Sequence, residues 1–175
     1  MSDDGLNRSL WEFSLALYAQ PGVAVRCLAL QDECGADVNL LLCAAWVGAS
    51  GRGQLDAAAI ADLEIIARPL HENVVQPLRA ARIWLKAAAG SDPELAKLRT
   101  EIKRLELSAE RAEQARLESQ LRGDATMLDR QRRRAAAISN MAVYLARLGC
   151  PAAAADVALE RGLDVLLASG QDGPA

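Results

Sequence analysis

The spacing of apolar and polar positions predicts helices along nearly the whole chain. Leu10, Phe13 and Leu17 recur at helical intervals, and no stretch alternates strictly between apolar and polar residues. Ser9 and Glu12 form the S-x-x-E pattern of a capping box, which predicts a helix that begins at Leu10. The pattern therefore favours an all-α protein.

Glycine and proline predict where the next helices end. A second helix is expected from Pro21 to about Cys34, with Gly35 as a left-handed cap. Asp37 fits the N-cap of a third helix, because its carboxylate can accept from amides two and three residues later. From Leu40 to Val47 this helix is apolar on every side, so it must be enclosed by other helices.

The middle of the chain predicts a loop and two further helices. The sequence "GASGRGQ", residues 48–54, is typical of a flexible connection, and a helix is expected at 56–67. Residues 72–89 predict another helix, with Pro77 at a kink or in its first turn. Gly90 then ends that helix, and Asp92 and Pro93 begin the next one.

The second half of the chain is densely charged. A long helix is expected from Pro93 to about Leu121, followed by a turn at Gly123–Asp124 and a helix to about Leu148. The apolar residues of the helix that begins at Pro93 are spaced by three and four positions in turn, as in a short heptad seam. The stripe consists of Leu95, Leu98, Ile102, Leu105, Ala109 and Ala112.

These elements predict a compact multi-helix bundle of about eight helices with a long charged antiparallel helix pair, in one domain overall. The expected division has a disordered N-terminus, a compact core, a long charged hairpin, a C-terminal helix and a disordered tail. These parts are residues 1–8, 9–90, 91–149, 150–169 and 170–175.

The charge and the lack of a long apolar run narrow the function classes. The formal net charge is −3, so no overall field attracts nucleic acid or a membrane surface. The N-terminus lacks the pattern of a secretory signal, and the longest apolar run, residues 38–49, is shorter than the roughly 20 residues of a membrane span. We expect a soluble, cytoplasmic protein without a membrane span.

The cysteines and the single histidine give weak support for a cofactor. Four cysteines, none in a CxxC pair, fit a reducing compartment. Cys27, Cys34, Cys43 and His71 lack the close ligand pairs of a zinc site. We therefore predict no metal, no cofactor and no catalytic residue, and favour a protein that is not an enzyme.

The polar residues before the third helix have two interpretations. Asp32, Glu33, Asp37 and Asn39 have the types and spacing that a helix end and a new N-cap need, and this interpretation is favoured. Two carboxylates beside an apolar helix would also suit acid–base chemistry. Alternatively, Asn39 anchors a small apolar or acyl ligand in a pocket that Trp11, Tyr18 and Trp46 line.

Two basic clusters are candidates for anion or partner binding. Arg79, Arg82 and Lys86 form one stripe on their helix, apart from its apolar side. Three arginines of "RQRRR" share a face farther along: Arg130, Arg133 and Arg134. A solvated face is the favoured interpretation of the first stripe, and contact with RNA or the ribosome through Arg130–Arg134 is only weakly supported.

Several segments together resemble a family of small bacterial proteins known as domain of unknown function 2390. The resemblance extends over about residues 9–168, and it implies a helical fold in a bacterial cytoplasm without naming an activity. Its main motifs are Leu10–Trp11, Tyr18 with Pro21–Gly22–Val23, Leu30–Gln31–Asp32, and Asp37–Val38–Asn39–Leu40 with Trp46. Further segments are "VVQPLRAARIWLK", "EIKRLELSAERAEQARL" and "NMAVYLARLG".

The leading functional hypothesis is a non-enzymatic adaptor or regulatory protein. It would bind a protein partner, or a second copy, through the helix Pro93–Leu121. The alternatives are a carrier or enzyme for a small apolar or acyl ligand, and an RNA-associated protein. A cavity beside Asn39 would favour the ligand, whereas an exposed apolar strip along residues 95–112 would favour the partner.

Overall fold

The structure is a computed structural model that describes residues 8–121, 128–150 and 157–168, and all regular elements within these ranges are helical. They comprise α1 Leu10–Tyr18, α2 Val23–Cys34, α3 Val38–Ala49, α4 Ala57–Leu70, the π-helical segment η1 His71–Val75, α5 Gln76–Ala88, α6 Pro93–Gln120, α7 Arg130–Arg147 and α8 Val157–Ala168. The all-α prediction is confirmed.

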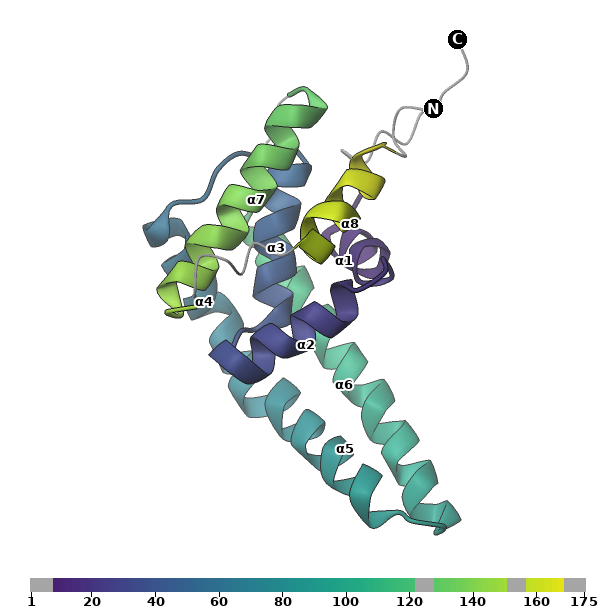
Figure 1. Ribbon diagram of the computed structural model, residues 1–175. Coiled ribbons are helices and arrows are strands. Elements are labelled where there is room, and N and C mark those ends of the chain that lie inside the picture. The colour runs from purple at the N-terminus through teal and green to yellow at the C-terminus, as the bar shows by residue number, and fades with distance from the viewer. Residues whose placement is uncertain (1–7, 122–127, 151–156, 169–175) are drawn as a thin grey trace.

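Helix α3 is the centre of the body. Every side chain from Asn39 to Ala49 is buried, and α7 runs alongside α3 (Figure 1). Helices α1, α4 and α6 also pack against α3. The prediction that Leu40–Val47 is enclosed by other helices is therefore confirmed.

The contact between α3 and α7 is close because both helices present small residues. A Cβ atom on Gly48 would lie 2.2 Å from the backbone nitrogen of Ala137 and 2.5 Å from the carbonyl carbon of Ala136. No side chain fits between these backbones. The loop after α3 is also held by α7, because Asn140 bonds the Gly53 carbonyl and the Leu55 amide.

The predicted helix caps are present. Ser9 and Glu12 form the capping box, Gly35 has φ +67°, and the Asp37 and Asp92 side chains cap α3 and α6. The expected turn at Gly123–Asp124, the start of the last helix and the two chain ends lie outside the described residues. Within them, the Asp129 carboxylate caps α7.

The path from α4 to α5 differs from the prediction of two separate helices. The chain stays helical through Pro69, and the η1 segment joins α4 directly to α5. In this segment the Gln76 amide bonds the carbonyl of His71, five residues earlier. Proline has no amide hydrogen to donate, and a π-helical turn lets the helix continue past the disturbed hydrogen-bond pattern.

The long antiparallel pair consists of α5 and α6, not of α6 and α7 as predicted for residues 91–149. The short turn around Gly90 reverses the chain, so α6 runs back along α5, and this pair projects from the body (Figure 1). Helix α7 instead packs on α3. Helices joined by a short loop become antiparallel neighbours, which explains the partner that α6 takes.

Only half of the predicted heptad seam of α6 lies on its buried side: Leu95 and Ile102 are partly buried and Ala109 is buried, whereas the other three residues are exposed. Leu98 and Leu105 are 48% and 46% exposed, and Ala112 is also exposed. The side that faces the body is largely polar. Its buried residues are Glu106, Ala109, Glu113, Gln114 and Leu117.

Two cysteines that the sequence analysis left unpaired form a disulfide. Cys34, at the end of α2, bonds Cys150, just after α7, with the Cα atoms 5.8 Å apart. Cys27 and Cys43 are free and buried. Each cysteine adjoins a glycine with positive φ at the end of its helix: Cys34 precedes Gly35, and Cys150 follows Gly149.

In the part of the chain that the structure describes, no single helix is long and apolar enough to cross a membrane. The bent pair α1 and α2 reaches the necessary length and composition only when both helices are taken together.

Candidate functional site

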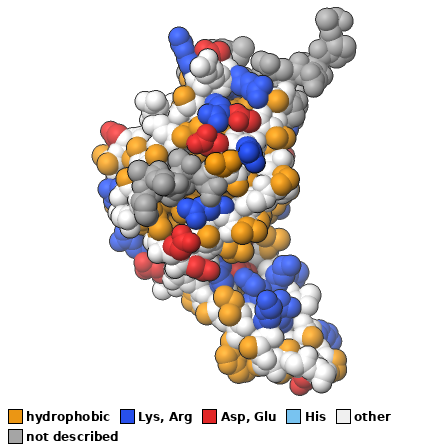
Figure 2. Space-filling model, in the orientation of Figure 1, with side chains coloured by type: hydrophobic (Ala, Val, Ile, Leu, Met, Phe, Trp, Pro, Cys, Tyr) orange, Lys and Arg blue, Asp and Glu red, His pale blue; other side chains and the backbone are white. Residues whose placement is uncertain are grey.

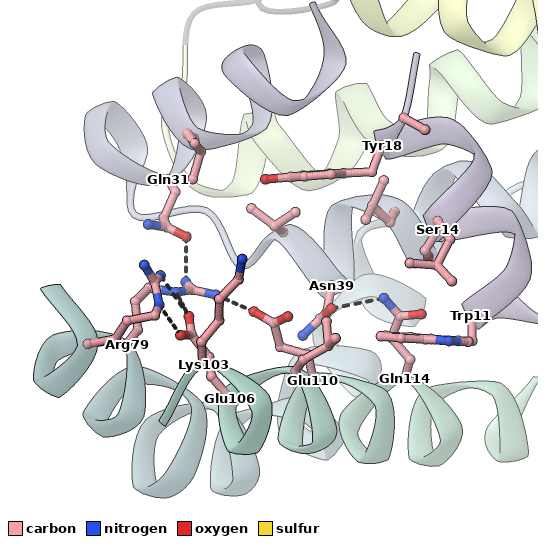
Figure 3. A pocket seen from close by; sticks show the side chains of 17 residues that line it. Trp11, Ser14, Tyr18, Gln31, Asn39, Arg79, Lys103, Glu106, Glu110 and Gln114 are labelled. Carbon is pink, nitrogen blue, oxygen red and sulfur yellow. Dashed lines mark hydrogen bonds and ion pairs between the residues drawn. The ribbon is translucent and has the colours of Figure 1, made fainter. Parts of the chain in front are cut away.

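A cavity of about 540 Å³ lies between α1, α2, α3, α5 and α6. Its walls are mainly apolar, and polar side chains gather at both ends (Figure 3). The lining residues are Trp11, Ser14, Leu15, Tyr18, Ala19, Leu28, Gln31, Val38, Asn39, Leu42, Arg79, Arg82, Lys103, Glu106, Leu107, Glu110 and Gln114.

One end of this main cavity has uncharged polar groups with unused hydrogen-bonding capacity. The Gln114 amide nitrogen donates to the Asn39 carbonyl oxygen at 2.9 Å. The Gln114 carbonyl oxygen and the Ser14 hydroxyl oxygen are buried without a hydrogen-bond partner among the described residues. Buried polar atoms normally have hydrogen-bond partners, so these two atoms are exceptions at this end of the cavity.

The other end carries charges. Arg79 donates to Glu106 at 3.0 Å and to Glu110 at 2.7 Å, and Arg82 also donates to Glu106. Burial raises the pKa of Glu106, but the two arginines outweigh burial and hold that pKa below its usual value. Lys103 lines this end and has no ion pair with a described residue, so the end has an excess positive charge.

A second polar cluster lies beside the main cavity, deeper in the body. Asp37 precedes α3, His71 begins η1, and Glu113 lies on the buried side of α6. The Nδ1 atom of His71 is 3.0 Å from an Asp37 carboxylate oxygen and 3.6 Å from a Glu113 carboxylate oxygen. These contacts lack the alignment of hydrogen bonds.

Burial and proximity change the pKa of each group in this cluster. Burial lowers the pKa of His71, but the two carboxyl groups outweigh it and raise the pKa to about 10. Burial raises the pKa of Glu113 to about 7, and the Asp37 charge adds to that effect. Burial also raises the pKa of Asp37, but its interactions with His71 and Glu113 hold it below the usual value. Without a further cation, Glu113 therefore retains a proton more readily than Asp37.

Neighbouring residues of the same elements form the buried cluster and the wall of the main cavity. Asp37 and Asn39, two positions apart, contact the consecutive residues Glu113 and Gln114 of α6. A smaller cavity of about 220 Å³ reaches His71. Gln31 and Arg79 line both cavities, and the hydrogen bond between them forms part of the wall between the two.

The structure places three of the four predicted ligand-binding residues at the main cavity. Trp11, Tyr18 and Asn39 line it, whereas Trp46 does not. Trp46 is 1% exposed, its indole nitrogen donates to the Arg8 carbonyl at 2.9 Å, and the Arg52 guanidinium stacks over its ring. Trp46 lies one helical turn beyond Leu42, which is the last residue of α3 at the cavity.

The predicted basic stripe on α5 is only partly at the cavity. Arg79 and Arg82 line it, and Lys86 is exposed one turn farther along. The acidic residues grouped before α3 in the sequence differ in burial. Asp32 and Glu33 are exposed, while Asp37 is buried as both an N-cap and a member of the second cluster.

The three arginines predicted to share a face at the start of α7 bond other parts of the protein, whereas a nucleic-acid surface would present them to solvent. Arg130 donates to the Asp164 carbonyl, and Arg134 pairs with Asp164 and Glu160. Arg133 is buried and donates to the Ala49 carbonyl at 3.4 Å. These contacts join α7 to α8 and α3, so they give the RNA hypothesis no support.

Most residues at these sites lacked a sequence signal. Ser14, Gln31 and Gln114 are polar residues on helices that the apolar pattern alone defined. Glu113 and Glu110 belong to a charged helix whose buried side was in part assigned to the wrong residues. His71 did have a signal, because it is the only histidine and follows Pro69 inside a helical segment.

The fold and these sites define an all-helical protein with one large open cavity and a buried histidine–carboxylate cluster. The chain belongs to the family described as protein of unknown function DUF2390, whose model matches residues 9–117. Neither the curated proteins nor the solved structures gave a match. The matched range contains the lining of the main cavity and all three residues of the buried cluster.

Proposed function

We propose that this protein binds a small amphipathic molecule in the main cavity, with an apolar body and an anionic group. The observation that carries the proposal is a mainly apolar cavity with the charged side chains of Arg79, Arg82 and Lys103 at one end. A cavity that is only a packing defect would be lined by apolar atoms. The volume, about 540 Å³, is within the roughly 300–1,000 Å³ typical of small-molecule sites.

The charges support an anionic group at the end opposite Gln114. Arg79, Arg82 and Lys103 face Glu106 and Glu110 there, which leaves one net positive charge when all five are ionised. Figure 3 places Lys103 and Arg79 at that end, and Trp11 and Gln114 at the other. A ligand that spans the cavity would therefore place its acidic group beside Lys103 and its apolar body against Trp11.

The lining favours binding over catalysis. The lining residues include neither a histidine nor a cysteine, and the carboxylates of Glu106 and Glu110 are both paired with Arg79. Leu15, Leu28 and Leu107 are about half exposed at the cavity, so its apolar wall continues to the surface. We therefore propose a carrier or sensor of a small amphipathic acid.

The proposal is tested by calorimetric titration with decanoate, decanol and decyltrimethylammonium. Decanoate is expected to bind one site per chain, more tightly than the neutral and cationic probes. Lys103→Glu should weaken decanoate binding at least tenfold, because it reverses the charge beside the acidic group. The matched control is Lys97→Glu on the same helix, outside the cavity. Equal affinity for all three probes, or equal effects of both substitutions, contradicts the proposal.

A second candidate is self-association through the α5–α6 pair. Ile83 and Trp84 of α5 and Leu98 of α6 are 56%, 65% and 48% exposed. Hydrophobic side chains appear on the projecting end of the pair (Figure 2). An isolated pair of helices that exposes large apolar side chains is typical of an interaction surface.

Light scattering after size-exclusion chromatography tests this candidate. The protein is expected to form a dimer that Trp84→Ser dissociates, while Ile65→Ser does not. Ile65 is the matched control, since it is 63% exposed on α4, away from the pair. A monomer at all concentrations, or dissociation by both substitutions, contradicts self-association through this surface.

A further inference from the structure

The buried cluster of Asp37, His71 and Glu113 has the composition of a metal site. Each residue presents one ligand atom, and the three atoms lie within 4.8 Å of one another. They come from three separate elements: the cap of α3, the segment η1 and the helix α6. We propose that these three side chains bind a divalent transition-metal ion.

The hydrogen bonds inside the cluster do not explain its burial. The Glu113 side chain is 0% exposed, and neither of its carboxylate oxygens has a hydrogen-bond partner among the described residues. The His71 Nδ1 atom is also buried without a partner. A buried carboxylate is normally paired and hydrogen-bonded, because the loss of its hydration is otherwise uncompensated. An ion between these atoms would satisfy all three residues.

The charges balance for a divalent ion. Two carboxylates and a neutral imidazole have a total charge of −2, which one divalent cation neutralises. In the described part of the chain, His71 is the only cationic side chain within ion-pair distance of Asp37 or Glu113. Without the ion, either a proton stays on Glu113 or a negative charge is left buried.

The distances match those around a small metal ion. Nitrogen and oxygen ligands of zinc lie at about 2.0–2.2 Å from it, so neighbouring ligand atoms are about 3.0–3.6 Å apart. The observed separations from His71 Nδ1 are 3.0 Å to Asp37 and 3.6 Å to Glu113. All three ligand atoms lie within 4.8 Å of one another, so side-chain rotation has to close any remaining gap between the two carboxylates.

The surroundings leave room for a fourth ligand. The smaller cavity, about 220 Å³, reaches His71 and is lined by Gln76 beside it. A water molecule that enters from this cavity can complete a tetrahedral site, as in zinc sites with three protein ligands. The ligand set of nitrogen and oxygen atoms, with no thiolate, suits Zn²⁺ and Mn²⁺, and Zn²⁺ is expected to bind more tightly.

Titration of the full-length, tag-free chain with Zn²⁺ and with Mn²⁺, after removal of metals with EDTA, tests the site. One equivalent of Zn²⁺ is expected to bind. Glu113→Gln should weaken that binding by at least about tenfold, since even changes next to metal ligands cost 10–100-fold. Glu72→Gln is the matched control, because Glu72 is adjacent to His71 but exposed. Its affinity should equal that of the unsubstituted protein.

A second measurement does not depend on the folding of a variant. His71 is the only histidine, so its imidazole signals in the proton NMR spectrum need no assignment. Substoichiometric Mn²⁺ should broaden them and one equivalent of Zn²⁺ should shift them. The proposal is overturned if neither ion changes these signals, or if Glu113→Gln folds and binds Zn²⁺ as tightly as the unsubstituted protein.

Discussion

Asn140 bonds three backbone groups with one side chain, one in α3 and two in the loop that follows it. Its amide nitrogen donates to the carbonyls of Ala44 and Gly53 at 3.2 Å, and its carbonyl oxygen accepts from the Leu55 amide at 2.8 Å. The side chain is 0% exposed, and none of its polar atoms is left without a partner. It thereby fixes the glycine-rich loop, which the sequence analysis expected to be flexible, against α3 and α7.

Replacement of this amide by an apolar group of similar shape should strongly lower the free energy of unfolding. Asn140→Leu leaves the buried Leu55 amide without a partner, at about 1–3 kcal/mol, and also removes the bond to the part-buried Gly53 carbonyl. We expect the free energy of unfolding to fall by about 3 kcal/mol, measured by urea denaturation. Asn73→Leu is the control, because Asn73 is exposed and bonds only the Pro69 carbonyl. Comparable losses in both variants would contradict a special role for Asn140.

The boundaries of the first helices and the burial of α3 could be predicted from the sequence, but the packing partners of α3 could not. The boundaries of α1 to α3 could be predicted because Ser9, Gly35 and Asp37 act locally, within one turn of the helix they cap. The enclosure of α3 could also be predicted, because a helix that is apolar on every side must be buried among other helices. The partners of α3 could not, because alanine-rich helices fit against many surfaces.

The site was less predictable than the fold for a physical reason. Apolar periodicity identifies a buried side only when that side is apolar, and α6 buries Glu106, Glu113 and Gln114. Such residues are stable inside only with partners from elsewhere in the chain, such as Arg79 and Asn39. Sequence spacing does not reveal those partners. Asn39 was recognised because an amide within an apolar helix needs an explanation by itself.

The crossing of α3 and α7 gives a test of helix packing. Gly48→Ala adds a Cβ atom that would lie within 2.5 Å of the α7 backbone, so the two helices must separate. We expect a loss of about 3 kcal/mol in the free energy of unfolding, at the upper end for an overpacked core.

The helical glycine of α8 is the matched control for this substitution. A Cβ atom on Gly162 would first meet the flexible end of the Leu17 side chain, at 2.9 Å. Gly162→Ala should therefore cost clearly less than Gly48→Ala. Equal losses in thermal or urea denaturation would show that backbone contact between α3 and α7 does not limit the residue at 48.

Helix α6 connects the parts of the molecule that carry the proposed functions. Its exposed N-terminal half belongs to the projecting pair with α5, and its C-terminal half lies against the body (Figure 1). In between, one polar side meets residues far away in the sequence, on α3, η1 and α5. Ligand binding, metal binding and self-association therefore all depend on where this one helix lies.

The buried cluster makes the stability of the metal-free protein depend on pH. In the folded protein the pKa of His71 is raised to about 10, whereas an unfolded chain releases this proton near pH 6.5. The folded state thus binds more protons between these values, and its stability decreases as the pH rises through them. Glu113, with a pKa raised to about 7, acts in the same direction at lower pH.

Urea denaturation in the presence of EDTA, between pH 7.5 and 8.0, measures mainly the effect of the histidine. This window lies above the pKa of Glu113, about 7, and below the ordinary pKa of the cysteine thiols, near 8.5, so Glu113, Cys27 and Cys43 contribute little. The free energy of unfolding should fall by up to about 1.4 kcal/mol per pH unit for the one proton involved. His71→Gln removes the titrating group and should flatten this dependence. If both proteins lose stability at the same rate, the imidazole is not held in its charged form between Asp37 and Glu113.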